Sequence, residues 1–310
     1  MRRLLRRLRE ARGQTLVFFV VLMGGLILLL AFVLNVGAVA STQRQTQSLA
    51  DGAALTGVQQ LPFDPSQAEV DAGGYGSCSV DCTINVSPDA MTISIQASRQ
   101  VSGLLLPLVT TPTAHASASA SIQPVQSLDN ATLRSVSSPN PKPYLVPLVL
   151  SPSSASCIPS CLNVQQTFSL GQGDFGFLCE GSSCTTGRRG SGGRNALARQ
   201  IDGQSYLGRT YSAGGSAPAA ATGTVTGSQV GSALRSIEDQ TVIVPIASGG
   251  VGGLRISGFG AFVITDVPFW DNLNGHQIRG YFKTYTAPEH LSTSPSTTNN
   301  YGVSVIGLTQ

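Results

Sequence analysis

Charged residues are few in this sequence: they make up 11% of its 310 residues, and histidine occurs only three times. Glycine, serine, threonine and proline are abundant instead, a composition common in exported, strand-rich proteins and unusual for a cytosolic enzyme. His115, His276 and His290 lie in an alanine-serine stretch, a turn and the region before the C-terminus. Since no G-x-S-x-G motif accompanies them, the sequence predicts no hydrolytic triad.

Other catalytic and ligand-binding patterns are missing too. The basic glycine-rich segment Gly187–Arg194 lacks the G-x-x-x-x-G-K-[ST] spacing of a phosphate-binding loop and indicates a solvated loop. Asp266, Asp271 and Glu238–Asp239 could be imagined as paired carboxylates, but nothing in their spacing brings them together, so we expect scattered surface acids. We expect Trp270 to pack in the core or in a turn. We therefore expect no catalytic residue, cofactor, metal or small-molecule substrate.

Positive charge is concentrated at the N-terminus. Residues 1–12 carry six arginines against one acid, Glu10, whereas the remaining 298 residues carry 13 basic and 15 acidic groups. The body of the chain is therefore slightly acidic. A nucleic-acid-binding domain normally has a basic face, so we expect no nucleic-acid partner.

A long apolar run follows the arginines. No charged residue occurs from Gly13 to Gln43, and Thr15–Ala40 is almost wholly apolar on every face of a helix. About 20 such residues cross a bilayer, so the run predicts a transmembrane helix. The arginine excess places 1–12 in the cytoplasm and everything after residue 41 outside, by the positive-inside rule. We expect a single-pass protein of the cytoplasmic membrane.

The helix is expected to continue beyond the membrane. Ser41–Gln60 contains no proline, and Pro62 follows as a stop signal. A weak apolar stripe runs along one side of this extension, formed by Leu49, Ala53, Ala54 and Val58.

Cleavage as a signal peptide is the alternative to retention of this helix. Ala38-Val39-Ala40 before Ser41 fits a small-x-small cleavage site. The apolar run, however, is about twice as long as the 7–15 residues of a signal peptide, which favours retention. Release after Ala40 would give a secreted adhesion or binding module; a membrane-tethered hydrolase is a further alternative.

Three short motifs lie in and around the span: Arg12-Gly13-Gln14-Thr15-Leu16-Val17, Asn35-Val36-Gly37 and Gln43–Gly57. In that order they resemble the RGQ-(A/T)-L-V start, the D-V-G position and the R-x-x-Q-x-A-A-D-A-A-A-L-A-G-A stretch of the TadE/TadG-like (Tad-domain) pilus-assembly proteins. The resemblance implies a structural role in assembly of a Tad/Flp-type pilus, with pilins or secretion-platform membrane proteins as partners. It marks the following residues as insertion or interaction elements: Arg12, Gly13, Gln14, Asn35, Gly37, Arg44 and Asp51.

The chain departs from this family at several points. Asn35 stands where the family has Asp, and Gly52 stands where it has Ala. Prepilin-type processing in related proteins cuts after Gly and requires Glu five residues later, but in this chain the residue five positions after Gly13 is Phe18. We therefore expect the N-terminal arm to be retained. The D-x-S-x-S metal site of some TadG-like members is absent from the sequence, so that activity is not expected.

The rest of the sequence is rich in strand patterns. Cys82–Ser87 and Met91–Ala97 alternate apolar and polar residues around a Ser-Pro-Asp-Ala turn and predict a β-hairpin. Arg99–Val109 is a more apolar piece, and His115–Ile122 is either a third strand or a low-complexity stretch. Further strands are expected at 144–150, 175–179, 241–247, 254–265 and 277–286, and short helices at 194–201 and 230–237.

Six cysteines form three close pairs in the sequence. In an exported chain an even count indicates disulfides, and proximity favours the local pairings Cys78/Cys82, Cys157/Cys161 and Cys179/Cys184. The same spacings permit a zinc site, but no histidine lies near any pair.

The fold class predicted is α+β, with a long N-terminal transmembrane helix, a pilin-like small antiparallel sheet and a second strand-rich exported domain. The expected regions are a basic arm at 1–12, the Tad-like helix at 13–60, a small strand-rich region at 61–122, a Pro-rich linker at 123–143, a strand-rich domain at 144–290 and a tail at 291–310, with 303–306 as an alternative edge strand.

Overall fold

A computed structural model gives two compact units. The first unit comprises Met1–Ala120 with Leu308–Gln310, and the second comprises Ser121–Gly307. The structure describes residues 2–309 except 62, 90, 102–112, 131–132, 134–142, 181–190, 206, 221–224, 251–252, 269, 271–274, 288–290, 292 and 294–299, and it leaves out the side chains of 2–16, 79–80, 191 and 309.

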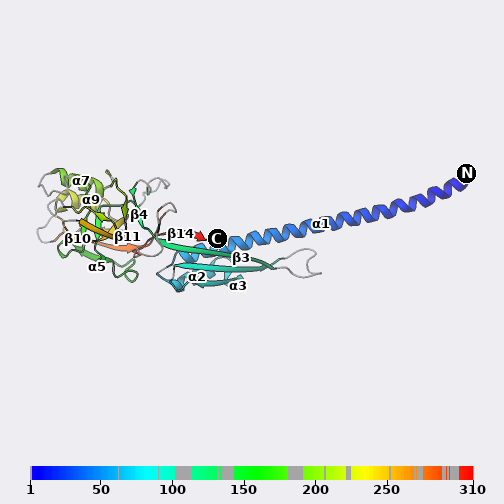
Figure 1. The fold of residues 1–310 in the computed structure, drawn as a ribbon, viewed down its shortest axis with the longest axis horizontal. Coiled ribbons are helices and arrows are strands. Elements are labelled where there is room, and N and C mark those ends of the chain that lie inside the picture. The colour runs from blue at the N-terminus through cyan, green and yellow to red at the C-terminus, as the bar shows by residue number, and fades with distance from the viewer. Residues whose placement is uncertain are drawn as a thin grey trace. The chain divides into compact units, whose positions relative to one another are not determined.

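The first unit is built on one long helix, α1, which runs from Arg2 to Val58 (Figure 1). The segment contains no proline, and its alanine, leucine and glutamine favour a helix. The predicted extension beyond the apolar run is therefore confirmed. A turn at Gln60 and Leu61 follows, and the Asp64 carboxylate accepts a 2.9 Å hydrogen bond from the Gln67 amide. This N-cap, with proline in the first turn, begins α2 (Pro65–Gly74).

A small sheet packs beside α1 in the first unit. Strands β1 (Cys82–Val86) and β2 (Thr92–Gln100) are antiparallel, with Cys82 opposite Ala97 and Val86 opposite Ile93. The predicted hairpin is thus confirmed, preceded by the short α3 (Cys78–Asp81). The next strand of the sheet is β3 (Thr113–Pro124), so His115–Ile122 is a strand. Most of the apolar piece 99–109 lies outside the described residues.

The second unit is built on a seven-stranded mixed sheet. The order is β6-β12-β11-β10-β5-β7, and β9 pairs with the beginning of β11. The bounds of its strands are β5 Leu148–Leu150, β6 Gln166–Ser169, β7 Phe175–Phe177, β9 Ser216–Ala217, β10 Thr241–Gly250, β11 Gly253–Asp266 and β12 Gln277–Lys283. The remaining elements are α5 (Pro152–Ala155), η2 (Leu170–Gln172), α7 (Ser191–Ile201), α9 (Ser228–Ser236), a pair β4 (Ser127–Leu128) and β8 (Tyr211–Ser212), and a parallel pair β13 (Tyr285–Ala287) and β14 (Val303–Thr309).

Both faces of this sheet are buried, as the alternation along β10 shows. Val242, Val244 and Ile246 belong to one hydrophobic cluster, whereas Ile243 and Ala247 belong to another. Successive side chains of a strand point to opposite faces, so the two clusters lie on the two sides of the sheet. Residues of α7 and α9 join the first cluster. The uninterrupted apolar run in β10 is what such a doubly covered strand requires.

The expected strands of this unit are present, with changes at their ends. The strand expected at 144–150 is shorter, because only Leu148–Leu150 form β5 and Leu145 makes an isolated bridge to Ile243. The strand expected at 277–286 is divided into β12 and β13 at Thr284. After this break β13 pairs with β14, so Val303–Thr309 is a strand. The short elements α2, α5 and β6 were not expected from the pattern.

Candidate functional site: the apolar helix and its docking surface

The N-terminal part of α1 presents bare apolar side chains on every face. Phe18 is 78% exposed, Leu28 72% and Phe32 68%, and large exposed side chains continue from Val17 to Val36. The helix over Val17–Val58 contains an 18-residue window with mean hydropathy 3.1, of which no part is buried. By its length and composition this helix can cross a membrane. A helix that is apolar all round needs burial in protein or lipid, and this stretch has no protein cover in the described chain.

The C-terminal part of α1 is docked on its own unit. Ala50, Ala53, Ala54 and Val58 have no exposed surface, and Leu49 is 8% exposed. These positions follow the helical repeat of three and four residues and make one stripe. The stripe faces α2 and β2. The alanines let both elements approach the helix axis closely, which a row of leucines would prevent.

Two glycines mark the closest approaches to this stripe. A Cβ atom built at Gly57 would lie 2.6 Å from Ile93 Cδ1, 2.8 Å from the Ala68 carbonyl oxygen and 3.0 Å from Ala72 Cβ. A Cβ atom at Gly52 would collide with the ring of Tyr75, the residue that caps the C-terminus of α2. Only glycine fits at either point without displacing a neighbour. Where the resembled motif has alanine, this chain has Gly52, and the Tyr75 ring occupies the space that the alanine methyl group would need.

Polar residues of the same segment tie the helix to the sheet. The Gln47 amide donates to Asp51 Oδ1 at 2.8 Å, one helical turn away, and to the Ser117 carbonyl of β3 at 3.2 Å. Thr46 is fully buried, and its hydroxyl donates to the Thr42 carbonyl at 2.8 Å. Asp51 thus orients Gln47, and Gln47 fixes the position of β3 along the helix. Sequence reasoning missed this bond, because no local pattern pairs residues 70 positions apart.

The remaining residues singled out from sequence have no such packing role. Arg44 and Gly37 are exposed, and Asn35 is partly exposed. A Cβ atom at Gly37 would meet nothing within 4 Å. Arg12, Gly13 and Gln14 lie in α1, but their side chains are outside the described residues. The structure therefore brings Asp51 into the docked region and leaves Asn35, Gly37 and Arg44 without intramolecular contacts of this kind.

Disulfides close two short loops. Cys78 and Cys82 are bonded across the junction of α3 and β1, and Cys157 and Cys161 are bonded after α5. Cys179 is also disulfide-bonded, whereas Cys184 lies outside the described residues. The first disulfide is adjacent to an ion pair, in which Arg99 Nε lies 3.1 Å from Asp81 Oδ2. These bonds hold the entry to the small sheet in one conformation.

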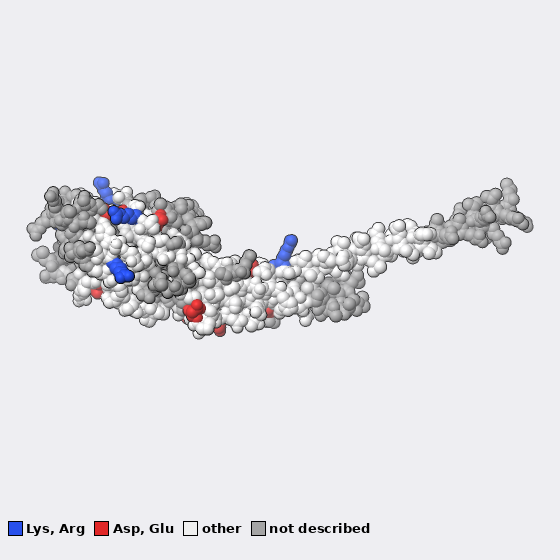
Figure 2. Space-filling model, viewed as in Figure 1, with Lys and Arg blue, Asp and Glu red and all other residues white. Residues whose placement is uncertain are grey.

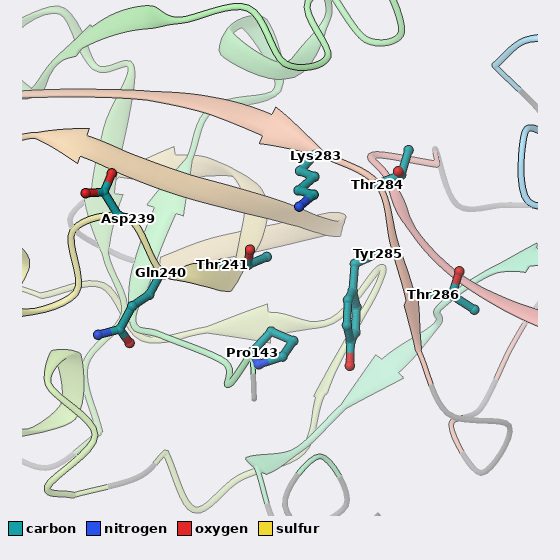
Figure 3. Close-up of a pocket in the computed structure, with 8 residues that line it drawn as sticks. All are labelled: Pro143, Asp239, Gln240, Thr241, Lys283, Thr284, Tyr285 and Thr286. Carbon is teal, nitrogen blue, oxygen red and sulfur yellow. The ribbon is translucent and has the colours of Figure 1, made fainter. Parts of the chain in front are cut away.

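The second unit has an open pocket of about 450 Å³ between the start of β10 and the region from β12 to β13 (Figure 3). In Figure 3 the Lys283 amine and the Tyr285 ring lie on the side opposite Asp239 and Gln240, with Thr241 between them. Partial burial raises the pKa of the Tyr285 phenol. The pocket residues supply no nucleophile paired with a base, so the pocket has no recognisable catalytic arrangement.

The titratable groups of the second unit serve its packing. Glu180 accepts hydrogen bonds from the Gly208 and Arg209 amides at 2.6 and 3.0 Å and from the Tyr211 hydroxyl at 2.6 Å. Burial, reinforced by the Glu180 bond, raises the pKa of Tyr211 above its ordinary value. Asp266 lies 3.4 Å from Arg279 in a half-exposed ion pair.

No metal-binding arrangement is present in the described parts of the chain, where no three His, Cys, Asp or Glu side chains converge. On the face seen in Figure 2, the charged atoms of the described residues are few, and at one place basic and acidic atoms lie side by side. Asp271 and His290 lie outside the described residues, as do residues 187–190 of the glycine-rich segment, whereas Ser191–Arg194 form the first turn of α7 and not the expected loop. Trp270 is 1% exposed, and its ring nitrogen donates to the Gly227 carbonyl at 3.0 Å, so it is a core residue.

In the described residues, α1 is bare and apolar in one half, which is long enough to cross a membrane, and it is docked on a small sheet in the other half. Residues 13–60 match the model of the Tad family, described as "Putative Flp pilus-assembly TadE/G-like". The matched segment is the apolar helix together with its docked extension. No curated protein and no solved structure matches the chain.

Proposed function

We propose that this protein is a structural, membrane-anchored component of a Tad/Flp-type pilus, either a minor-pilin-like subunit or an envelope assembly factor. The observation that carries the proposal is the division of the Tad-like segment. Its apolar half is bare, and its alanine- and glycine-rich half holds a small sheet through Ala53, Ala54 and Gly57. Such a subunit acts mechanically: the helix stays in the membrane and packs against pilin or secretion-platform helices, and the exported units offer protein-binding surfaces.

The proposed location is the cytoplasmic membrane, with the N-terminal arm in the cytoplasm and both units outside. Six arginines within residues 1–12 support this orientation, because cytoplasmic flanks carry the excess of positive charge. The disulfides Cys78–Cys82 and Cys157–Cys161 support an oxidising compartment for the rest of the chain.

Deletion of the gene in its host, with complementation by the full chain, tests the role in piliation. We expect surface pili, counted by electron microscopy and in the sheared fraction, to be lost on deletion and restored by the wild-type gene. Normal piliation in the deletion strain would refute the proposal.

A helix replacement separates anchoring from pilus-specific packing. In the variant, the bare stretch 17–36 is replaced by leucines, which keeps its length and apolar character and removes its shape. We expect this variant to fractionate with membranes and to fail in complementation. If it restores pili, the helix serves as an anchor only.

N-terminal sequencing of the protein from membranes tests retention of the helix. We expect an intact arginine-rich N-terminus. A new N-terminus at Gln14 would mean prepilin-type processing after Gly13, and one at Ser41 would mean release as a secreted module after Ala40.

A further inference from the structure

Arg44 is a charged residue of the docked Tad-like motif whose chemistry the fold does not use. It is exposed, and it is the only cation between residues 41 and 60. In the described chain it has no ion pair or hydrogen bond through its guanidinium, whereas Arg99 in the same unit is paired with Asp81. Its height on α1 indicates which partner this exposed cation can reach.

The bare apolar stretch sets the position of the membrane on α1. The apolar run Thr15–Ala40 is 26 residues long, or about 39 Å of helix, so it more than covers the roughly 30 Å of hydrocarbon in a bilayer. Arg44 lies four residues after this run and eight residues after Val36, the last large side chain of the exposed apolar stretch, so it is about 6–12 Å above the hydrocarbon edge. The headgroup layer is about 5–8 Å thick on each side. Side chains on a helix point toward its N-terminus, so Arg44 extends down toward this layer and its long stem covers the remaining distance.

One end of the small sheet also lies near the membrane surface. The Gln47 side-chain amide donates a hydrogen bond to the Ser117 carbonyl of β3. Further along β3, the Ser119 hydroxyl donates one to the carbonyl of Ile93, and the Ile93 side chain packs on Gly57. Strand β3 therefore runs in the same direction as α1, as Figure 1 shows, and its first residue is the one nearest the membrane.

The height of the first residue of β3 follows from strand geometry. Thr113 lies four residues before Ser117, or about 13 Å closer to the membrane. Gln47 is 11 residues, or about 16 Å, above Val36. The start of β3 thus reaches within a few ångströms of the hydrocarbon edge, in the headgroup layer, and Thr113 is exposed there.

We propose that Arg44 and the adjoining end of the sheet at Thr113 form a contact surface for the phosphate headgroups of the bilayer, which seats the first unit on the membrane. The inference rests on the proposed membrane anchoring of α1 and goes beyond it, because an anchor alone sets an approximate height and supplies no contact between the unit and the headgroups. A guanidinium binds phosphate with paired N–H donors, so Arg44 is suited to this contact. The seat holds the first unit at a fixed distance from the membrane in which partner helices lie.

The experiment places a nitroxide label on the full chain in vesicles of phosphatidylcholine and phosphatidylglycerol that carry a Ni²⁺-chelating lipid. One variant is Thr113→Cys. The matched control is Asn85→Cys, an exposed strand residue of the same sheet that lies opposite Ser94 at the far end. We expect the lipid-bound Ni²⁺ to enhance relaxation of the label several-fold more at 113 than at 85. A water-soluble Ni²⁺ complex should show the opposite preference.

Substitutions at Arg44 complete the test. In the Thr113→Cys background, Arg44→Glu should reduce the preference for lipid-bound Ni²⁺ at least two-fold, and Arg44→Lys should preserve most of it, because the charge remains. Equal enhancement at 113 and 85 in protein that floats with the vesicles would overturn the seat and leave the anchor intact. An unchanged signal in Arg44→Glu would overturn the role of Arg44. Protein that fails to float would refute the anchoring, and with it the proposed function.

Discussion

The close approach at Gly57 leads to a prediction that the same substitution has different effects at two glycines of one helix. Glycine costs up to about 1 kcal/mol relative to alanine in a helix interior, so Gly→Ala stabilises a helix where space is free. At Gly37 a Cβ atom meets nothing within 4 Å. At Gly57 it would lie 2.8 Å from the Ala68 carbonyl oxygen, which is backbone and has little freedom to move.

The magnitude follows from these two terms. Overpacking of this kind costs about 1–3 kcal/mol. The helix gain is reduced at Gly57, because α1 ends one residue later, at Val58. We therefore expect Gly57→Ala to weaken docking of α1 by about 1–2 kcal/mol, a roughly 5- to 30-fold increase in local opening. Gly37→Ala should leave docking unchanged.

Native-state hydrogen exchange of the full chain in nanodiscs measures this opening. Amides of residues 49–58 should exchange faster in Gly57→Ala, whereas peptides from the second unit serve as the internal reference. Wild-type protection in Gly57→Ala would show that the helix and α2 are not in close contact, and the packing argument for the Tad-like motif would fail.

Two further predictions concern the second unit. Replacing Trp270 by Phe removes the hydrogen bond to the Gly227 carbonyl and leaves part of the indole's space in the core unfilled. We expect the free energy of unfolding to fall by about 1–3 kcal/mol, measured by circular dichroism in urea because this is the only tryptophan, and an unchanged midpoint would contradict its core role. The second prediction is that stability depends on pH through Tyr211, because burial and the hydrogen bond to Glu180 raise the pKa of this residue in the folded state. A raised pKa contributes stability below the unfolded value near pH 10 and loses it as the pH rises further, so the advantage of wild type over Tyr211→Phe in denaturant unfolding should shrink above about pH 10. A constant difference from pH 8 to pH 11 would contradict this linkage.

Several features of this protein could be predicted from local sequence. Thr15–Ala40 is apolar on every face, and no folded unit of this size could cover all of it, so a bare helix follows from the pattern alone. The four-residue spacing of Cys78/Cys82 and Cys157/Cys161 made local bonding the simplest outcome, and both pairs are bonded. The alternation in 82–97 predicted the hairpin, because a strand repeat of two residues needs no information from distant chain.

Other features were decided by tertiary structure, because their causes lie far apart in the sequence. Gly52 looked like a neutral departure from a motif until Tyr75 was found on top of it. Gln47 and Ser117 meet only when β3 lies along α1. The sequence predicted an apolar stripe at Leu49, Ala53, Ala54 and Val58. It did not predict which elements cover the stripe, because α2 and β2 are brought there only by the fold. Local patterning determined which surfaces must be covered. The close approach of segments that are distant in the sequence determined where those surfaces need small residues.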